Sequence, residues 1–465
     1  MHNIFMRKNS TDREKKTIIW IVVITAFVTT FTGSALNLSI PDISDEFGIN
    51  AGTVGWLVTG YTLAVAAMSV PMGHLADETC RETVLAAGTA IFTACCIAAV
   101  FSVSMVMLLV VRIVQGIGAA MIFSTNTAIL VGSFPESRRG RVIGYSLAAT
   151  YAGMSAGPAV GGFMNHHFGW RSIFILTGII CVAALIPAIF RLSGQRTGRV
   201  RCPADLIGNI LYMAFIVTLM YGLSELGRGN AAVIMIIIGV MLGTIFVRHE
   251  LKTEKPVIKM TIFRDNPCFT TANIAAMMNY GATFAVTYLI SIYLQAVMGF
   301  TSQTAGFIMI CQPVVIAALT PVAGKFSDRL SPYVMSSAGM ALCAAGTCIL
   351  TFIAEETGLP VIISALIVTG AGFALFSSPN TNAVMSSVDQ DEYSAASSIL
   401  ATMRSAGNTL SMIIVTVIAG IYLPDSSLAG AELQLIVRIV NISFIAFTAV
   451  CTAGIFISLK HGVKR

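Results

Sequence analysis

Long apolar stretches recur along almost the whole chain, and they constrain its fold more than any other feature of the sequence. A helix needs about 20 apolar residues to cross a bilayer, and fourteen runs approach that length. They cover approximately residues 17–40, 53–75, 83–104, 105–133, 141–164, 170–192, 205–225, 231–248, 267–297, 304–325, 333–354, 359–386, 395–422 and 435–459. Only 11% of the residues are charged. The sequence therefore predicts an all-α polytopic membrane protein with fourteen transmembrane helices, or twelve if 205–248 does not form two spans.

The distribution of positive charge predicts how these helices are oriented. Of the 28 Lys and Arg residues, only Arg112 and Arg404 lie deep inside expected spans. Three others, Arg171, Arg228 and Arg438, lie on loops that would face away from the termini, and the rest lie on the terminal side. Positive residues are retained in the cytoplasm. We therefore expect a multi-pass protein of the cell membrane with both termini cytoplasmic, and we expect no nucleic-acid partner despite the net charge of +6.

A short motif occurs once in each half of the chain and indicates an internal repeat. Gly73 and Asp77 follow the second run, and Gly324 and Asp328 follow the tenth, 251 residues further on. Transporters are commonly built from such repeats, so we expect two six-helix bundles with an extra helix pair inserted between them. The expected division is an N-terminal tail (1–16), an N-terminal bundle (17–192), the inserted pair with its cytoplasmic linkers (193–266), a C-terminal bundle (267–459) and a C-terminal tail (460–465).

Glycines in the fifth run form a face without side-chain bulk. Gly153, Gly157 and Gly161 recur every fourth residue, and Gly162 follows directly. Such a face lets a neighbouring helix approach closely. Pro158 cannot donate a backbone hydrogen bond, so the helix should bend there. The simplest alternative is an ordinary packing face, but we expect this one to act as a close-packed pivot and seal.

Several segments together resemble signatures of the major facilitator superfamily, and most closely those of its fourteen-span drug:proton antiporters. The segments are the loop Gly73 to Arg81 with its second copy Gly324 to Arg329, the run Arg112-Ile-Val-Gln115-Gly-Ile-Gly, the GxxxGPxxGG pattern Gly153 to Gly162, the pair Trp170-Arg171, and Ser394 to Asn408. The resemblance covers the whole chain. It implies the major facilitator fold and secondary active export of small amphipathic compounds by alternating access. It also implies a proton gradient as the energy source, with no cofactor.

The resemblance gives the two repeated loops a role in the conformational change. We expect that role for Gly73, Asp77, Arg81, Gly324, Asp328 and Arg329. In the first loop, Glu78 and Cys80 stand where the family usually has an arginine and a glycine. We therefore expect a weaker ion pair in the first loop, whereas the second loop retains Asp328-Arg329. A second departure is Thr32, which replaces the membrane aspartate of the family in the first span.

Two arginines inside the spans are the main functional candidates. An arginine at mid-membrane costs at least ~2.5–3.5 kcal/mol. Arginine stays protonated, so neither residue can itself cycle a proton. For Arg112 a packing role within its bundle is an equal alternative. Arg404 is expected to face the central cavity, with Asn380, Asn382, Asn408 or a bound anion as its partner.

These charges leave two transport mechanisms open, because every acidic residue can be placed on a loop or at a span end. The first is proton-driven export of amphipathic compounds. The second is an exporter or flippase-like carrier of an anionic or zwitterionic, lipid-like substrate without the usual proton coupling. A membrane sensor that does not transport also stays open.

Neither an enzyme nor a metal site is expected. The six histidines fall on termini or loops, without metal-ligand spacing. The expected partners are a small amphipathic substrate and the lipid bilayer, and we expect a monomer. The residues expected to line the cavity are Asn37, Arg112, Gln115, Asn126, Asn279, Tyr280, Tyr288, Gln312, Asn380, Asn382, Arg404 and Asn408.

Overall fold

The structure is a computed structural model that describes residues 12–37, 39–48, 56–192, 205–224, 230–253, 256–258, 261–300, 302–422 and 433–459. Within these ranges the chain forms helices and no strand. The first half contributes α1 (Asp12–Asn37), α2 (Ile40–Phe47), α4 (Trp56–Glu78), α5 (Arg81–Val100), α6 (Met105–Ser133), α7 (Glu136–Ala156), η1 (Gly157–Gly161), α8 (Gly162–Phe168), α9 (Arg171–Pro187) and η2 (Ala188–Leu192). The inserted pair is α10 (Leu206–Ser224) and α11 (Asn230–Glu250).

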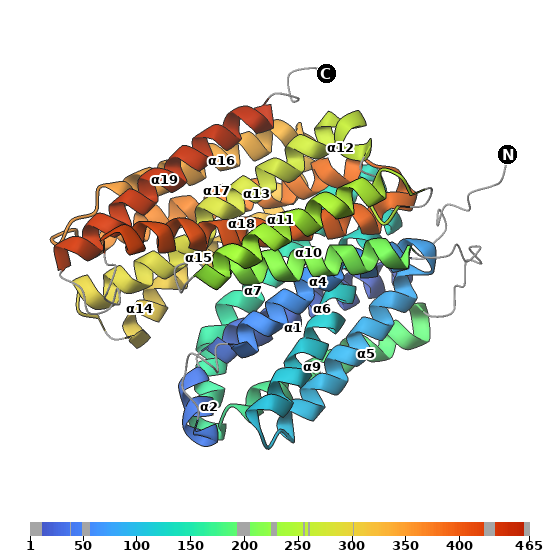
Figure 1. The fold of residues 1–465 in the computed structure, drawn as a ribbon, viewed down its shortest axis with the longest axis horizontal. Coiled ribbons are helices and arrows are strands. Elements are labelled where there is room, and N and C mark those ends of the chain that lie inside the picture. Colours follow the sequence, from blue (N-terminus) through green and yellow to red (C-terminus); the bar gives the residue numbers. More distant parts are fainter. Residues whose placement is uncertain are drawn as a thin grey trace.

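The second half has a similar series of long helices. It contributes α12 (Thr261–Asp265), α13 (Pro267–Ile292), η3 (Tyr293–Val297), α14 (Ser302–Met309), α15 (Cys311–Ser327), α16 (Pro332–Thr351), α17 (Leu359–Ser386), η4 (Gln390–Glu392), α18 (Tyr393–Tyr422) and α19 (Leu433–Leu459). Figure 1 shows the blue and cyan helices of the first half on one side and the yellow to red helices of the second half on the other.

Twelve helices in the described part of the chain are long and apolar enough to cross a membrane. This confirms a polytopic membrane protein. The two other expected spans are present as long helices, α7 with its continuation through η1 and α8, and α18, but they are not among the twelve. The total of fourteen spans stays a prediction for these two helices.

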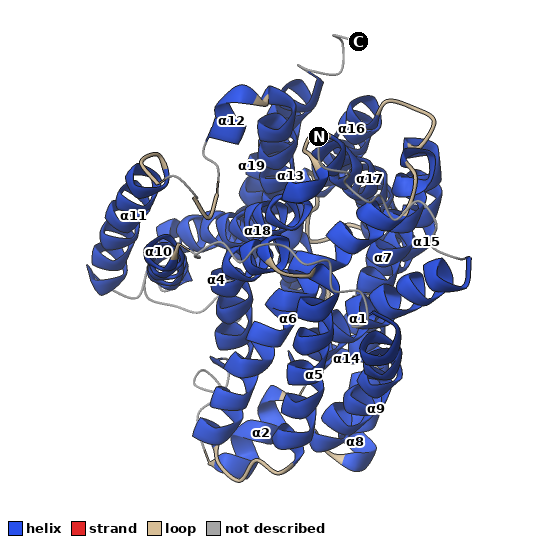
Figure 2. Ribbon diagram, turned by 90° about the vertical axis from the view of Figure 1, so that its right-hand side faces the viewer, coloured by secondary structure: helices blue, strands red, loops and turns tan. Residues whose placement is uncertain are grey.

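The inserted helices pack beside the junction of the two halves. Figure 2 shows α10 next to α4 and α18, with α11 outside it. The hydroxyl of Tyr212 on α10 lies 2.8 Å from the hydroxyl oxygen of Thr402 on α18 and donates to the carbonyl of Ala66 on α4 at 3.4 Å. One side chain of the inserted pair therefore contacts both halves.

The glycine face of α7 packs against α1. A Cβ added at Gly153 would clash with the backbone carbonyl of Phe27, and one added at Gly161 would clash with Ala35. The helix does deform at the predicted place, because residues Gly157–Gly161 form a π-helical turn. The face joins two helices of the same half. The proposed role as a pivot would therefore act through the packing of α1 on α7.

Hydrogen bonds and one ion pair connect the ends of α2, α5 and α9. Glu46 on α2 accepts a hydrogen bond from Trp170 Nε1 at 2.7 Å and forms an ion pair with Arg171 at 2.7 Å. Arg171 also donates to the carbonyl of Ser102 at 2.9 Å. The hydrogen bonds from Arg171 lower the pKa of the Glu46 carboxyl. We call this end of the molecule the outer face, and the end that holds the two repeated loops the terminal face.

Candidate functional site

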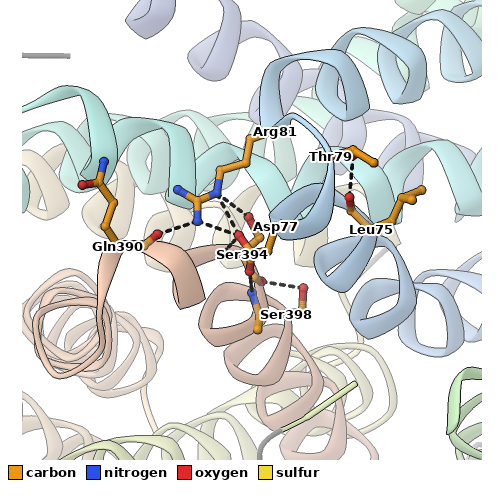
Figure 3. A network of polar contacts seen from close by, with 8 residues as sticks. Leu75, Asp77, Thr79, Arg81, Gln390, Ser394 and Ser398 are labelled. Atoms are coloured by element: carbon orange, nitrogen blue, oxygen red, sulfur yellow. Dashed lines mark hydrogen bonds and ion pairs between the residues drawn. The ribbon is translucent and has the colours of Figure 1, made fainter. Parts of the chain in front are cut away.

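The two halves meet at the terminal face through the first repeated loop (Figure 3). Asp77, at the end of α4, accepts hydrogen bonds from the backbone N–H groups of Ser394 at 3.3 Å and Ala395 at 2.8 Å. Both amides lie in the first turn of α18, where a helix leaves N–H groups unpaired and favours negative charge. Arg81 donates to Asp77 at 2.6 Å and also to the carbonyl of Gln390. Asp77 and Arg81 thus connect α4 and α5 to the start of α18.

The second repeated loop makes the equivalent connection with different partners. Asp328, after α15, accepts from the backbone N–H of Gly140 at 2.6 Å and of Arg141 at 3.2 Å, both on α7. Burial raises the pKa of the Asp328 carboxyl, and these two N–H donors oppose the rise. Within the described residues Asp328 forms no ion pair with Arg329. The prediction that the first loop has the weaker ion pair is therefore wrong, because Arg81 pairs with Asp77 even though Glu78 stands where the family usually has an arginine.

Glycines bring the helices of the two halves into close contact at this face. A Cβ added at Gly324 on α15 would clash with the carbonyl of Gly140 on α7, and one added at Gly73 on α4 would clash with Ser398 on α18. Only glycine permits this approach of one helix to another. The structure therefore has the two halves closed against each other at the terminal face.

A cluster of aromatic side chains lies deeper at the same junction. The hydroxyl of Tyr151 on α7 is 3.0 Å from that of Tyr280 on α13. Both rings pack edge-on against Phe373 of α17, with centroids 5.3 and 5.0 Å away. The guanidinium of Arg404 on α18 lies over the Tyr280 ring, 5.3 Å from its centroid. We call Tyr151, Tyr280, Phe373 and Arg404 the central cluster.

Only some of the hydrogen-bond donors of Arg404 have a partner in the protein. Its Nη2 donates to the hydroxyl of Thr381 on α17 at 2.6 Å, whereas its buried Nε has no hydrogen-bond partner. The side-chain oxygen of Asn408, one turn further along α18, is also buried without a partner. No ion pair with a described carboxylate is found for Arg404. This arrangement can accept the negative or electron-rich group of a small molecule.

Arg112, the other arginine inside a span, lies within the first half. It is fully buried, donates to Gln115 at 2.6 Å and to the carbonyl of Leu57 at 3.3 Å, and stacks on Tyr61 at 4.3 Å. Gln115 in turn donates to the sulfur of Cys96 at 3.2 Å. Arg112 and Gln115 on α6 therefore connect this helix to α4 and α5. This arrangement supports the packing role that was the alternative for Arg112.

The other expected cavity residues are dispersed. Asn126 donates to Thr25 at 3.1 Å within the first half, and Asn279 to Cys343 and Asn382 to Ser327 within the second. Gln312 and Asn380 are buried on α15 and α17, and Tyr288 is 41% exposed on α13. Asn37 ends α1, and its side chain lies outside the described residues. Of the twelve expected residues, Tyr280, Arg404 and Asn408 are those placed at the central cluster or one turn from it.

The first span carries no carboxylate where the family has one. Thr32 is buried and donates to the carbonyl of Val28 at 2.8 Å, with its hydroxyl 3.3 Å from that of Thr177 on α9. Every acidic residue that the structure describes lies at a helix end or between helices. A proton site at mid-membrane is thus not provided by the described carboxylates.

Sequence reasoning missed two residues of the central cluster, Tyr151 and Phe373, and also Thr381, which accepts a hydrogen bond from Arg404. Tyr151 lies two residues before Gly153. The glycine pattern of that helix predicts a packing face and gives no sign of a side chain that faces the other half. Phe373 is one of 26 phenylalanines and carries no polar signal. The missed cue was the position of Tyr151 on the helix that carries the antiporter-like motif.

Three possible metal donors, far apart in the sequence, lie together in the structure. Asp205, His249 and Glu250 each place one donor atom within 4.8 Å of the others. The expectation of no metal site relied on spacing along the chain, and Asp205 is 44 residues from His249. The antiparallel packing of α10 on α11 brings them together.

Comparisons with known proteins agree with this architecture. The sequence is 28% identical over 393 residues to the riboflavin transporter RibZ of Clostridioides difficile (strain 630), covering 84% of this chain and 86% of the relative. It is 27% identical to the multidrug resistance protein Stp of Mycobacterium tuberculosis (strain H37Rv), covering 81% and 70%. It is also 27% identical to the methylenomycin A resistance protein of Streptomyces coelicolor, covering 83% of each chain.

A solved structure shares the fold. The human organic anion transporter MFSD10 (TETRAN) superposes with a TM-score of 0.65, covering 97% of this chain and all of that one, at 11% identity. Residues 22–412 match the family described as Major Facilitator Superfamily. Its members are transporters and not enzymes, in agreement with the prediction. The chain belongs to the Major Facilitator Superfamily.

Proposed function

We propose that this transporter exports small aromatic, amphipathic compounds by alternating access, and that the substrate binds at the central cluster. The observation that carries the proposal is the position of the cluster. Tyr151 belongs to the first half, whereas Tyr280, Phe373 and Arg404 belong to the second. A site built from both halves changes its exposure when one half moves against the other.

The side chains of the cluster favour a substrate with a flat, apolar body. Aromatic rings offer large contact areas and prefer stacked or edge-on partners. Tyr151 and Tyr280 add hydroxyl groups that can exchange their mutual hydrogen bond for one to a ligand. The substrate would then lie between the rings of the two halves.

Arg404 supports a second candidate, a transporter of anionic or zwitterionic compounds. Its Nε has no partner, and no described carboxylate neutralises it. A carboxylate or phosphate group on the substrate would satisfy that donor. This candidate differs from the first in substrate charge and in its independence of a proton gradient.

Export as the direction of transport is supported by the names of relatives, which include drug and antibiotic resistance proteins. Proton antiport is the coupling we propose, on the resemblance to drug:proton antiporters. We further propose that the protein lies in the cell membrane as a monomer with both termini in the cytoplasm. The terminal face, closed in this structure, would then be the cytoplasmic one.

Transport in proteoliposomes with an imposed pH gradient tests the proposal. We would compare a cationic and an anionic fluorescent amphiphile, and riboflavin because one relative is named for it. The variants are Arg404→Ala and Arg404→Lys. Arg438→Ala is the matched control, because Arg438 lies over Tyr422 near the end of α18, away from the cluster.

The outcomes separate the two candidates. Gradient-driven movement of the cationic compound that survives Arg404→Ala supports proton-coupled export of amphiphiles. Movement of the anion that ignores the gradient, and that Arg404→Ala abolishes, supports the second candidate. If no compound moves in wild type while the protein binds one of them, the chain acts as a sensor and both transport proposals fail.

A further inference from the structure

We propose that Asp205, His249 and Glu250 form a binding site for a divalent transition-metal ion, with Zn²⁺ as the best fit. The site lies at the terminal face, at the start of α10 and the end of α11. It is distant in sequence from every residue of the central cluster, and it does not depend on the transport activity proposed above.

The donor set is the first part of the argument. One imidazole and two carboxylates are ligands that zinc accepts, usually with a fourth position held by water. The three donor atoms lie within 4.8 Å of one another. Zinc bonds of about 2.0–2.2 Å require donor separations near ~3.4 Å. The separation of 2.9 Å between His249 Nε2 and Asp205 Oδ2 would therefore lengthen slightly, and any separation close to 4.8 Å would shorten by on the order of 1 Å.

Glu250 gives a second observation that points to a bound cation. Glu250 is 3% exposed, and one oxygen, Oε2, accepts from the backbone N–H of Ile258 at 2.8 Å. The other oxygen, Oε1, is buried without any hydrogen-bond partner. A buried carboxylate oxygen without a partner is costly, and a second carboxylate, Asp205, lies beside it. A cation between the two carboxylates would remove both penalties.

Gly208 allows the two carboxylates to lie side by side against the backbone of α10. A Cβ added to Gly208 would clash with both Oε1 of Glu250 and Oδ2 of Asp205. The absence of a side chain at position 208 therefore lets one oxygen of each carboxylate approach the same part of the backbone. His249 Nε2 reaches the same carboxylate of Asp205 at 2.9 Å.

The site is also accessible from solvent at the terminal face. The His249 side chain is 27% exposed, whereas that of Asp205 is 8% exposed. Metal entry by way of the imidazole would replace the His249–Asp205 hydrogen bond with two bonds to the ion. The ion would join the beginning of α10, the end of α11 and, through Glu250, the backbone at Ile258 that precedes α12.

Zinc titration of the purified full-length protein in detergent tests the inference. His166 and His167 are adjacent on α8 and can bind zinc adventitiously, so both are replaced by alanine in every sample. After removal of metals with EDTA, we expect one zinc per chain with micromolar or tighter affinity, and a rise of several degrees in the thermal unfolding midpoint. Substituted Co²⁺ should give the intense visible absorption of a four-coordinate site.

Three variants identify the ligands. His249→Ala and Glu250→Gln should each weaken zinc binding at least a hundredfold. Gly208→Ala should do so without removing a donor, because the added methyl group would push both carboxylate oxygens out of their positions. Glu136→Gln is the matched control for Glu250→Gln: Glu136 is an exposed carboxylate at the start of α7, paired with Arg139, and its loss should leave zinc binding unchanged.

Two results would overturn the assignment. The first is the absence of zinc binding by the folded protein in which only His166 and His167 are replaced. The second is stoichiometric binding that Glu250→Gln leaves intact. Because the Co²⁺ spectrum and the stoichiometry are measured on a protein with all three proposed ligands, the test does not depend on whether a variant folds.

Discussion

The hydroxyl groups of Tyr151 and Tyr280 lie 3.0 Å apart, one on each half of the transporter. They belong to the two helices, α7 and α13, that also hold Phe373 between them. Any motion that separates the halves at this depth must break this hydrogen bond and open the ring contacts. The pair therefore links occupation of the central cluster to the conformational change.

Removing either hydroxyl should have the same effect as removing both. We expect Tyr151→Phe and Tyr280→Phe each to change the transport kcat/KM by several-fold, corresponding to about 1 kcal/mol for one hydrogen bond. The double variant should resemble either single one, because the two side chains share one interaction. Transport kinetics of the three variants measure this, and strictly additive losses would mean that each hydroxyl acts alone.

Asp77 should stabilise the state that is closed at the terminal face. Asp77→Asn removes the charge that binds Arg81 and the first turn of α18, so we expect the open state to gain population by several-fold. Spin labels on cysteines introduced at the exposed positions Thr79 and Asp391, in a cysteine-free background, report the distance between the two sides of this contact.

The exposed Asp389 offers the control for the same labels. Asp389 precedes η4, and its side chain makes no capping hydrogen bond. Asp389→Asn should leave the distance distribution as in wild type. An unchanged distribution in Asp77→Asn as well would remove Asp77 from the conformational change.

Two glycines, Gly144 on α7 and Gly157 at the start of η1, should respond differently to leucine. Gly144 contacts Thr320 and Pro321 on α15, across the junction, whereas Gly157 contacts Ser34 on α1, within the first half. We expect Gly144→Leu to favour the open state with a near-normal unfolding midpoint. Gly157→Leu should lower the midpoint by several degrees and block transport while the protein still inserts.

A glycine with free space around it provides the control for both variants. Gly306 on α14 has no atom within 4 Å of an added Cβ, so Gly306→Leu should change neither the unfolding midpoint nor the spin-label distances. Undiminished transport by Gly157→Leu would contradict the pivot role of that face.

The ion pair at the outer face should make a pH-dependent contribution to stability. Hydrogen bonds from Arg171 lower the pKa of Glu46 below its ordinary value of 4.5, so its contribution is complete above that pH and disappears as pH falls through the lowered pKa. Both side chains are more than a third exposed, which limits the effect to roughly 0–1 kcal/mol. Glu46→Gln should unfold at a lower temperature than wild type at pH 7, and the difference in unfolding temperature should vanish in acid.

The control is Asp45→Asn, which changes an exposed neighbouring carboxylate. This variant should unfold at the same temperature as wild type at pH 7.

Sequence patterns predicted most of the fold because membrane helices are long and apolar, and a run such as 105–133 reappears as α6 with the same bounds. The repeat of Gly73 and Gly324 likewise identified two real contact points between the halves. Side-chain partners were harder to predict. Arg112 and Arg404 look alike in sequence, yet one is enclosed within its half and the other lies at the junction. That difference depends on helix rotation, which a uniformly apolar run does not specify.

The position of Tyr212 has a consequence for the surrounding lipid. Its hydroxyl contacts α4 through Ala66 and α18 through Thr402, so α10 cannot stay fixed to both halves when they separate, and it must travel with one of them. α11, which packs on α10, has to move as well. It presents a row of exposed apolar side chains, among them Ile234, Ile237 and Met241. Each transport cycle would therefore rearrange the annular lipids beside this helix pair, and the thickness and fluidity of the bilayer would enter the rate of the conformational change.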